Sequence, residues 1–321
     1  MTAPLLQLDE LRLHFDIGGG LFARRHRIQA VDGVSFSLEA GEAFGLVGES
    51  GCGKSSLAKA ILHLHRPSGG KVAFDGTDLG ALGPEQWRPL RRRIQYVFQD
   101  PLAALDPRMT VVDQVAEALA IHGIGDRAAQ QARAFSQLEL VGLSHEQGRK
   151  YPHALSGGQR QRAVLARALV LEPDLLICDE PLSALDVSIQ AQVVNLLVEL
   201  RERLKVTLLF ISHDLSLVRH LCSRVAVMYS SRIVELGHAD ALFDRPRHPY
   251  TRALVAAIPV PEPREREPEL IASGEPPSLL NPPPGCRFHT RCPAATAQCR
   301  AEAPPLIPLA DGRLAACHLE R

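Results

Sequence analysis

The sequence predicts an α/β protein with an antiparallel β region at its start, a helical subdomain inserted into its sheet and a small cysteine-rich C-terminal extension. Three observations support this prediction. Strand-like and helix-like runs alternate in the second half of the chain, apolar and polar residues alternate in the first forty positions, and four of the seven cysteines fall in the last 36 residues. A chain of 321 residues is long enough for one large domain and a smaller one.

The first hundred residues contain most of the predicted strands. The segments LLQLDELRLHF and IQAVDGVSFSLEA both alternate, and a glycine-rich insertion at 18–20 separates them, which predicts an antiparallel pair. The segment AFGLVGES predicts a buried strand that runs into glycines, and SSLAKAILHLH predicts an amphipathic helix that Pro67 ends. KVAFDGTDL predicts a strand with a turn at Asp75-Gly76, and IQYVFQD predicts a buried strand that closes at Gln99.

Residues from about 100 to 170 place apolar side chains three and four positions apart, which predicts helices. Three strand-containing units follow, beginning at DLLICDE, VTLLFISHD and RVAVMYSSRIVEL, and they favour a parallel sheet covered on both faces. We therefore predict a domain over 1–240, with the helical subdomain at about 100–170, and an extension over 241–321. The charged, proline-rich segment 259–269 is predicted to be a linker or surface arm.

The charge and hydropathy of the chain exclude several classes of protein. Its 36 basic and 36 acidic residues give a formal net charge of +0, which argues against a broad nucleic-acid or anionic-membrane surface. No run of 18 apolar residues occurs, and the first residues lack the basic and apolar regions of a signal peptide. We expect a cytosolic chain whose cysteines are reduced thiols or metal ligands.

The segment Gly48–Ser55 fits the phosphate-loop pattern G-x-x-x-x-G-K-[ST] and lies between a predicted strand and a predicted helix. A chance glycine-rich turn is the alternative, but it does not explain the strand-to-helix context. Backbone N–H groups of such a loop surround phosphates, Lys54 bridges the β- and γ-phosphates, and the Ser55 hydroxyl ligates Mg²⁺. Ser56 adds a second hydroxyl. The nucleotide-binding residues predicted here are Gly48, Ser50, Gly51, Cys52, Gly53, Lys54, Ser55 and Ser56.

The strand DLLICDE ends in two acidic residues. Asp179 is placed to hold Mg²⁺, directly or through water, and Glu180 is placed to accept a proton from the attacking water. Solvated acids at a strand end are common in isolation. Beside a phosphate loop in the same chain, however, the pair predicts ATP hydrolysis.

The segment Leu155–Gln159 reads LSGGQ and resembles the signature of ATP-binding-cassette (ABC) proteins, which other phosphate-loop ATPases lack. The resemblance implies an ABC-type P-loop ATPase core in which Ser156, Gly157, Gly158 and Gln159 bind the γ-phosphate of ATP held by an opposite subunit. The following residues, QRQRAVLARALV, form the predicted helix whose N-terminus would attract that anion.

The remaining functional residues are expected at positions that match other motifs of the ABC family. Gln99 resembles the Q-loop glutamine, which senses Mg²⁺ and nucleotide. Asp186, in the segment 183–186, resembles the D-loop aspartate at the dimer interface, and His213 resembles the switch histidine at the γ-phosphate. A single histidine is usually structural, but its place in this ordered set reverses that expectation. Phe15 is the candidate for stacking on adenine, with Phe22 as its rival.

Four further segments narrow the resemblance to one branch of the family. The segments 99–108, 151–153 and 247–251, together with 278–293, resemble ATP-binding subunits of bacterial dipeptide and oligopeptide importers. The implied function is ATP hydrolysis that energises peptide import. Nickel and glutathione importers share the extension and remain alternatives for the cargo. A soluble ABC ATPase acting on DNA or ribosomes, or a non-catalytic regulator, is a weaker alternative.

The resemblance also implies partners. One cassette without a membrane span needs a second ABC ATPase subunit, which in this family is often a related but different chain. It also needs two transmembrane permeases and an extracellular or periplasmic peptide-binding protein. The expected location is the cytoplasmic face of the inner membrane, through the permeases.

The C-terminal cysteines, Cys286, Cys292, Cys299 and Cys317, are separated by five, six and 17 residues. Four thiolates suit Zn²⁺ or an iron–sulfur cluster, and this spacing matches neither zinc ribbons nor common ferredoxin runs. Buried thiols without metal are a third possibility. The family resemblance implies a [4Fe–4S] cluster first and Zn²⁺ second. His289 and His318 are expected at the surface or behind the ligands, and Cys52, Cys178 and Cys222 as small buried side chains.

Overall fold

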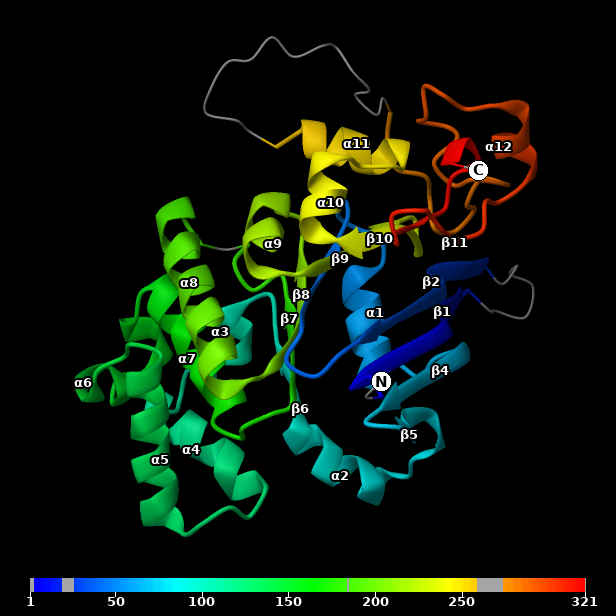
Figure 1. Cartoon of the computed structure of the whole chain (residues 1–321). Helices are drawn as coiled ribbons and strands as arrows, with labels where there is room; N and C mark the ends of the chain where they lie inside the picture. The colour runs from blue at the N-terminus through cyan, green and yellow to red at the C-terminus, as the bar shows by residue number, and fades with distance from the viewer. Residues whose placement is uncertain (1–2, 19–25, 184, 259–273, 321) are drawn as a thin grey trace. The chain divides into compact units, whose positions relative to one another are not determined.

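The computed structural model describes residues 3–18, 26–183, 185–258 and 274–320 (Figure 1). The predictions for the segment 259–269, for Phe22 and for position 184 of the D-loop segment lie outside these residues. The chain forms two compact units. Unit 1 comprises residues 1–39, 43–81 and 212–321, and unit 2 comprises residues 40–42 and 82–211.

Unit 1 begins with an antiparallel sheet, as the alternating pattern predicts. Within the described residues its strand order is β2-β1-β4-β5, where β1 is Leu6–Ile17, β2 is His26–Leu38, β4 is Gly69–Phe74 and β5 is Thr77–Asp78. The four leucines of β1 are buried and most of its polar positions are exposed, whereas Ile17 at the end of the strand is exposed. The period of two is interrupted between Leu8 and Leu11, where the pairing register shifts.

A second set of strands in unit 1 is mixed. β3 (Ala43–Val47) runs parallel to β9 (Arg224–Tyr229), whereas β10 (Arg232–His238) runs antiparallel to β9. β12 (Leu314–Ala315) and β11 (Ile307–Pro308) extend this edge in antiparallel fashion. The prediction of an entirely parallel sheet was therefore wrong here. Ser230 and Ser231 adopt positive φ angles of 43° and 74° and form a tight hairpin, which joins antiparallel strands without a crossover.

The helices of unit 1 are short. Their bounds are Lys54–Ile61 for α1, Leu215–Leu221 for α9, Ala239–Asp244 for α10, Pro249–Ala256 for α11 and Ala297–Ala301 for α12, with 3₁₀ turns at Leu79–Ala81 and His318–Glu320. The helix α1 ends six residues before Pro67, because His63 adopts a left-handed φ of 52° that stops it earlier than predicted. No helix in the described part of the chain is long and apolar enough to cross a membrane.

Unit 2 contains three neighbouring parallel strands, β8 (Thr207–Ser212), β7 (Leu175–Asp179) and β6 (Ile94–Val97). Every residue of β7 and β8 is buried, as expected for parallel strands covered on both faces. The helices between β6 and β7 confirm the predicted helical block. Their bounds are Pro101–Ala104 for α3, Val111–Ile121 for α4, Arg127–Leu140 for α5, His145–Gly148 for α6 and Gly157–Leu169 for α7, with a 3₁₀ turn at Pro152–Ala154.

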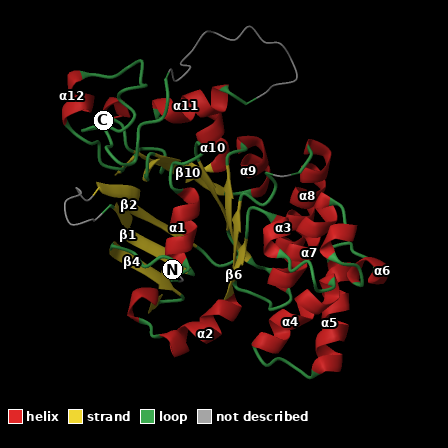
Figure 2. Cartoon of the chain, turned by 180° about the vertical axis from the view of Figure 1, so that it is seen from behind, coloured by secondary structure: helices red, strands yellow, loops and turns green. Residues whose placement is uncertain are grey.

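Within unit 2, α4, α5 and α7 pack against one another, and α7 also contacts α8 (Val187–Leu204) (Figure 2). The sequence analysis did not predict α2 (Pro84–Arg93). This helix is strongly polar, and Trp87 is its one buried side chain, so it lacks the apolar periodicity that reveals a helix in a sequence.

A buried carboxylate attaches the C-terminal extension to β10. Glu235 is fully buried and accepts hydrogen bonds from the backbone N–H groups of Arg247 and His248, at 3.0 and 2.8 Å. Arg313, beside β12, places its guanidinium 3.5 Å from Glu235 and donates to Asp311. Burial raises the pKa of Glu235, and the neighbouring Arg313 acts in the opposite direction. The ionic pair therefore compensates a charge that would otherwise be costly to bury.

We expect Arg313→Ala to lower the free energy of unfolding by about 3 kcal/mol, because removing one member of a buried pair leaves the other without compensation. Chemical denaturation of the full chain measures this change. Arg203→Ala, at an exposed position of α8, is the matched control and should shift stability by no more than about 0.5 kcal/mol. Equal stabilities of the two variants would contradict the assigned role of Arg313.

His248 starts α11 and is almost completely buried, at 1% exposure. Its ring Nδ1 accepts a hydrogen bond from the backbone N–H of Tyr250 at 3.1 Å, so the imidazole caps the helix in its neutral form. Burial, aided by the charge of Arg252, lowers the pKa of His248 to about 3. The folded chain therefore keeps this ring neutral at pH values where an unfolded chain protonates it.

This difference predicts a loss of stability in acid. The unfolded chain gains a proton on His248 as the pH falls below about 6.5, whereas the folded chain does not, so the free energy of unfolding should decrease from pH 7 to pH 4. His248→Asn retains a capping acceptor that does not titrate, and should reduce this dependence. Denaturation curves at several pH values compare the two proteins, and identical slopes would refute the prediction.

Candidate nucleotide-binding site

The predicted phosphate loop connects β3 to α1 in unit 1, and glycine is required at two of its positions. Gly48 has a φ of 154°, and a Cβ atom there would lie 2.1 Å from the carbonyl oxygen of Met228. Gly53 has a φ of 110°, and a Cβ atom would lie 2.1 Å from the carbonyl oxygen of Ala30. The loop is thus pressed between β2 and β9, where only bare backbone fits. At Gly51 an added Cβ atom would meet no other atom, so glycine is favoured there only by the left-handed φ of 79°.

Lys54 is the first residue of α1 and is 4% exposed. Its ammonium group donates to the carbonyl oxygens of Gly48 at 2.8 Å and Glu49 at 3.1 Å, so the cation lies over the loop itself. Ser55 and Ser56 follow in the first turn of α1. The N-cap residue is Gly53, so no side chain of the cap accepts a hydrogen bond from the first N–H groups of the helix. A buried cation above a helix N-terminus and a glycine-rich loop is suited to binding polyphosphate.

Two neighbours of this loop were missed by the sequence analysis. Arg291, from the C-terminal extension, donates to both carboxylate oxygens of Glu49, at 2.8 and 3.0 Å. The backbone N–H of Glu49 donates to the Tyr250 hydroxyl at 2.8 Å. Glu49 occupies an unspecified position of the phosphate-loop pattern, and its partners lie about two hundred or more residues away, so no local spacing reveals the contacts.

In unit 2 the structure brings together two residues that the sequence predicted separately. Gln99 donates to the carboxylate of Glu180 at 3.2 Å. Glu180 has a left-handed φ of 45°, and its backbone N–H donates to Ile211. Such backbone strain often accompanies a functional position. The preceding Asp179 is 3% exposed and accepts a hydrogen bond from the Tyr96 hydroxyl at 2.6 Å.

Tyr96 was not predicted as a site residue, although it lies three positions before Gln99. Burial and the adjacent Asp179 both raise the pKa of the Tyr96 hydroxyl, which keeps it protonated. It therefore remains a hydrogen-bond donor and orients the Asp179 carboxylate.

The segment that resembles the ABC signature begins α7. Ser156 is the N-cap of this helix, and its side chain and that of Gln159 form a reciprocal capping box. A Cβ atom at Gly158 would lie 2.6 Å from Ile189 of α8, and one at Gly157 would lie 3.1 Å from Leu185. The two glycines therefore allow Leu185 and Ile189 to pack closely against the first turn of α7.

The remaining predicted residues occupy separate places. Asp186 is exposed at the N-cap of α8 in unit 2, and His213 is exposed directly after β8. Phe15 lies on β1 in unit 1, where its ring meets His65 edge-on with centroids 5.3 Å apart. The role of Phe15 toward adenine stays a prediction.

The four C-terminal cysteines line one small cavity in unit 1, which Phe288, His248, His289 and His318 also line. None of the four forms a disulfide. Burial, strengthened by the neighbouring thiols, raises the pKa of Cys286 to about 11. Burial also raises the pKa of Cys292 and of Cys317. No set of three or more His, Cys, Asp or Glu residues in the described chain is arranged to hold a metal ion. Cys52, Cys178 and Cys222 are buried, as expected.

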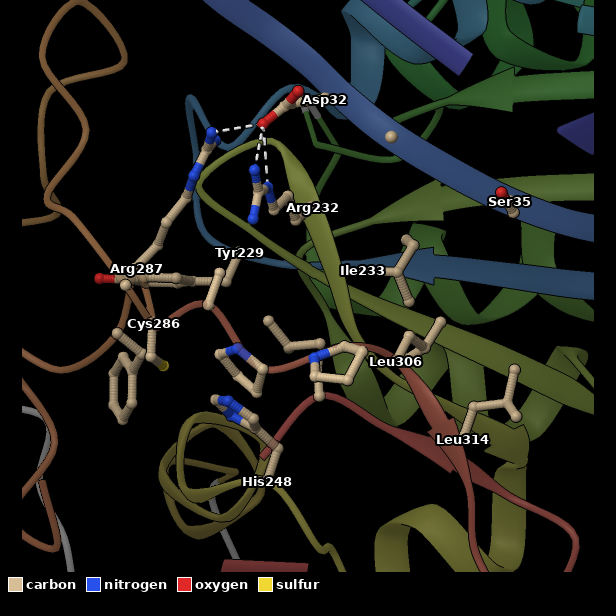
Figure 3. Close-up of a pocket in the computed structure, with 18 of the residues that line it drawn as sticks. Asp32, Ser35, Tyr229, Arg232, Ile233, His248, Cys286, Arg287, Leu306 and Leu314 are labelled. Atoms are coloured by element: carbon tan, nitrogen blue, oxygen red, sulfur yellow. Dashed lines mark hydrogen bonds and ion pairs between the residues drawn. The ribbon is translucent and has the colours of Figure 1, made fainter. Parts of the chain in front are cut away.

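A larger cavity of about 520 Å³ lies between β2, β10 and the extension (Figure 3). At its charged end, one carboxylate oxygen of Asp32 accepts hydrogen bonds from Arg232 at 2.7 Å and from Arg287 at 2.6 Å. Burial would raise the pKa of Asp32, but the two guanidinium groups outweigh it and lower the pKa. Ile233 and Leu314 line the opposite, apolar end.

Comparison with known proteins agrees with these features. Residues 31–183 match the family model "ABC transporter", and residues 234–299 match "Oligopeptide/dipeptide transporter, C-terminal region". The chain is 49% identical over 320 residues to a "Probable peptide ABC transporter ATP-binding protein" of Sinorhizobium fredii, covering 99% of this chain and 91% of the relative. It is 46% identical to the "Di/tripeptide transport ATP-binding protein DppF" of Pseudomonas aeruginosa, covering 98% and 97%.

Comparison with a solved structure also indicates an ATP-binding cassette. A dimeric ATP-binding cassette in a post-hydrolysis state bound to ADP and Pi aligns with a TM-score of 0.65 and 26% identity, covering 73% of this chain and 98% of that one. The phosphate loop, the carboxylates at the end of β7 and the capped glycines of α7 are thus parts of an ABC-type ATPase core. The chain belongs to the family of ABC transporter ATP-binding proteins that carry the oligopeptide/dipeptide transporter C-terminal region.

Proposed function

We propose that this chain binds and hydrolyses ATP to energise the import of di- or oligopeptides by a multi-subunit ABC transporter. The observation that carries the proposal is the hydrogen bond between Gln99 and Glu180, which holds a carboxylate beside Asp179 at the end of a buried parallel strand. Glu180 is the general base for the attacking water, and Gln99 orients it.

The phosphate loop supports the binding half of this function. Lys54 is held by loop carbonyl oxygens and is positioned to exchange them for phosphate oxygens. Ser55, Asp179 and Gln99 would hold Mg²⁺, since hydroxyl, carboxylate and amide oxygens suit this ion. When bound, Mg²⁺ neutralises charge on the β- and γ-phosphates. His213 is the candidate contact to the γ-phosphate.

Two cassettes are needed for one complete site in this proposal. The N-terminus of α7, with Ser156 to Gln159, supplies N–H donors to the γ-phosphate held by an opposing cassette. Asp186 lies at the interface with that cassette. The partner is a related but different chain, and the pair works with two permeases and a peptide-binding protein at the cytoplasmic face of the membrane.

Glu180→Gln should lower the kcat for ATP hydrolysis by at least about 100-fold, because the amide cannot accept the proton, while MgATP binding persists. Phosphate release and nucleotide binding are measured on the same preparation. Glu85→Gln, exposed on α2, is the matched control and should hydrolyse ATP at the wild-type rate. Undiminished hydrolysis by Glu180→Gln would refute the base assignment.

The cargo is tested with the same proteins reconstituted with their permeases and binding protein. Labelled dipeptide should accumulate with wild-type chain and not with Glu180→Gln. Accumulation of Ni²⁺ or glutathione in place of peptide would support the alternative cargoes, and ATP hydrolysis stimulated by DNA or ribosomes would support a soluble ATPase.

We also propose that Cys286, Cys292, Cys299 and Cys317 hold a [4Fe–4S] cluster, with Zn²⁺ as the alternative. The support is that four thiols, the donor set of such a cluster, line one cavity. The raised pKa values of Cys286, Cys292 and Cys317 keep these three thiols protonated without metal, so loading releases protons and is favoured as the pH rises. His289 lines the same cavity, and its Nδ1 atom lies 2.8 Å from the Cys286 carbonyl oxygen.

Anaerobically purified chain should contain about four iron and four sulfide ions and show broad visible absorption. Cys299→Ser, at the buried end of the set, should lose most of this iron, whereas Cys222→Ser, outside the cavity, should retain it. Zinc without sulfide would favour the alternative. A chain free of both metals would refute the site.

A further inference from the structure

Two residues of the C-terminal extension, Tyr250 and Arg291, form hydrogen bonds with Glu49 of the phosphate loop, and the contact from Arg291 is ionic and bidentate. We propose that Arg291 is a positioning residue for the phosphate loop, through which the extension controls ATP affinity. This inference rests on the proposed ATP site at Gly48–Ser55. It assigns a function in ATP binding to a residue outside the ATPase core.

Every polar group of Glu49 that is available for anchoring takes part in the loop's structure. Its backbone N–H donates to Tyr250, and its carboxylate accepts from Arg291. Its carbonyl oxygen accepts from the Lys54 ammonium and, at 3.3 Å, from the backbone N–H of Cys52. A displacement of Glu49 would therefore move the carbonyl oxygen that holds Lys54. The position of this side chain and the conformation of the phosphate-binding residues are directly linked.

Arg291 is itself rigidly held. Its side chain is 8% exposed, and its guanidinium lies 5.8 Å from the ring centroid of Tyr229 and 6.0 Å from that of Phe288. The rings of Tyr229, Tyr250 and Phe288 form an aromatic cluster with centroids 4.5 to 5.5 Å apart. Stacking and cation–π contacts fix the guanidinium plane in the orientation that a bidentate carboxylate pair requires.

The segment that carries Arg291 is attached to the core at a second point. Arg287, four residues earlier, is 8% exposed and donates to Asp32 at 2.6 Å and to the carbonyl oxygen of Ser230 (Figure 3). The backbone N–H of Ser231 donates in turn to the Cys52 carbonyl oxygen at 2.8 Å. Arg287 and Arg291 thus both connect to the phosphate loop, Arg291 through Glu49 and Arg287 through the hairpin between β9 and β10.

The charge of the pair has a separate consequence for ATP. Glu49 places a carboxylate within the loop that binds a polyphosphate, and like charges at close range repel. The Arg291 guanidinium neutralises this carboxylate from the side of the extension. Without it, the carboxylate is left uncompensated beside the phosphates, and ATP affinity falls even if the loop keeps its conformation.

The test is a double-mutant cycle on the full chain, read out as the Kd for Mg²⁺ and a non-hydrolysable ATP analogue. Arg291→Ala should weaken binding about tenfold, which corresponds to about 1.4 kcal/mol. Glu49→Gln/Arg291→Ala should recover most of this loss, because it removes the uncompensated charge. Arg291→Lys should recover only part, since lysine keeps the charge without the bidentate geometry. The KM for ATP should rise while kcat changes less than about twofold.

Arg300→Ala, exposed on α12, is the matched control in the same extension and should leave the Kd unchanged. An Arg291→Ala protein with wild-type affinity would overturn the proposal, whereas a double variant that binds no better than Arg291→Ala would support positioning of the loop over charge compensation. If Arg291→Ala does not fold, Arg291→Lys and Arg291→Gln provide the same comparison. Lys54→Ala separates the two hypotheses. If Lys54→Ala still binds the analogue, the ATP site itself is refuted. If Lys54→Ala loses analogue binding while Arg291→Ala keeps the wild-type Kd, only the role of Arg291 is refuted.

Discussion

The close confinement of the phosphate loop between β2 and β9 is the constraint on which the rest of the site depends. The Cα atoms of Gly48 and Gly53 face the carbonyl oxygens of Met228 and Ala30 at distances that leave no room for a side chain. Strand positions therefore dictate the conformation of the loop, and its N–H groups are oriented before any ligand binds. Lys54 completes this preorganised site by lying across the same carbonyl oxygens that shape the loop.

Three arginines of the C-terminal extension repeat one kind of interaction. Arg287, Arg291 and Arg313 are each nearly buried, and each contacts a carboxylate of the core, on β2, on the phosphate loop and on β10 respectively. A buried charge is costly without its partner, so these pairs favour the docking geometry in which each arginine meets its carboxylate. The balanced composition of the chain, with equal numbers of basic and acidic residues, is consistent with such internal pairing.

The carboxylates at the end of β7 illustrate how one strand supplies two chemical roles. Asp179 is buried and accepts a hydrogen bond from the Tyr96 hydroxyl, which orients its carboxylate. Glu180, one residue later, leaves the strand with a left-handed φ angle and is held by Gln99 at the surface. A strand end separates the two side chains because successive residues point to opposite sides. One carboxylate is thereby suited to a metal ion and its neighbour to an attacking water.

The phosphate loop, the paired acids and the glycines of α7 could be predicted from the sequence, because phosphate and metal binding require particular residue types at short, regular spacings. The sequence also determined the antiparallel start and the inserted helices through their apolar periods. The antiparallel edge of the sheet and the ion pair between Arg291 and Glu49 became visible only in the tertiary structure. These two residues are 242 positions apart, and the pair depends on packing of the aromatic cluster and the extension against the core. Such long-range contacts leave no periodic or local pattern in the chain from which they can be predicted.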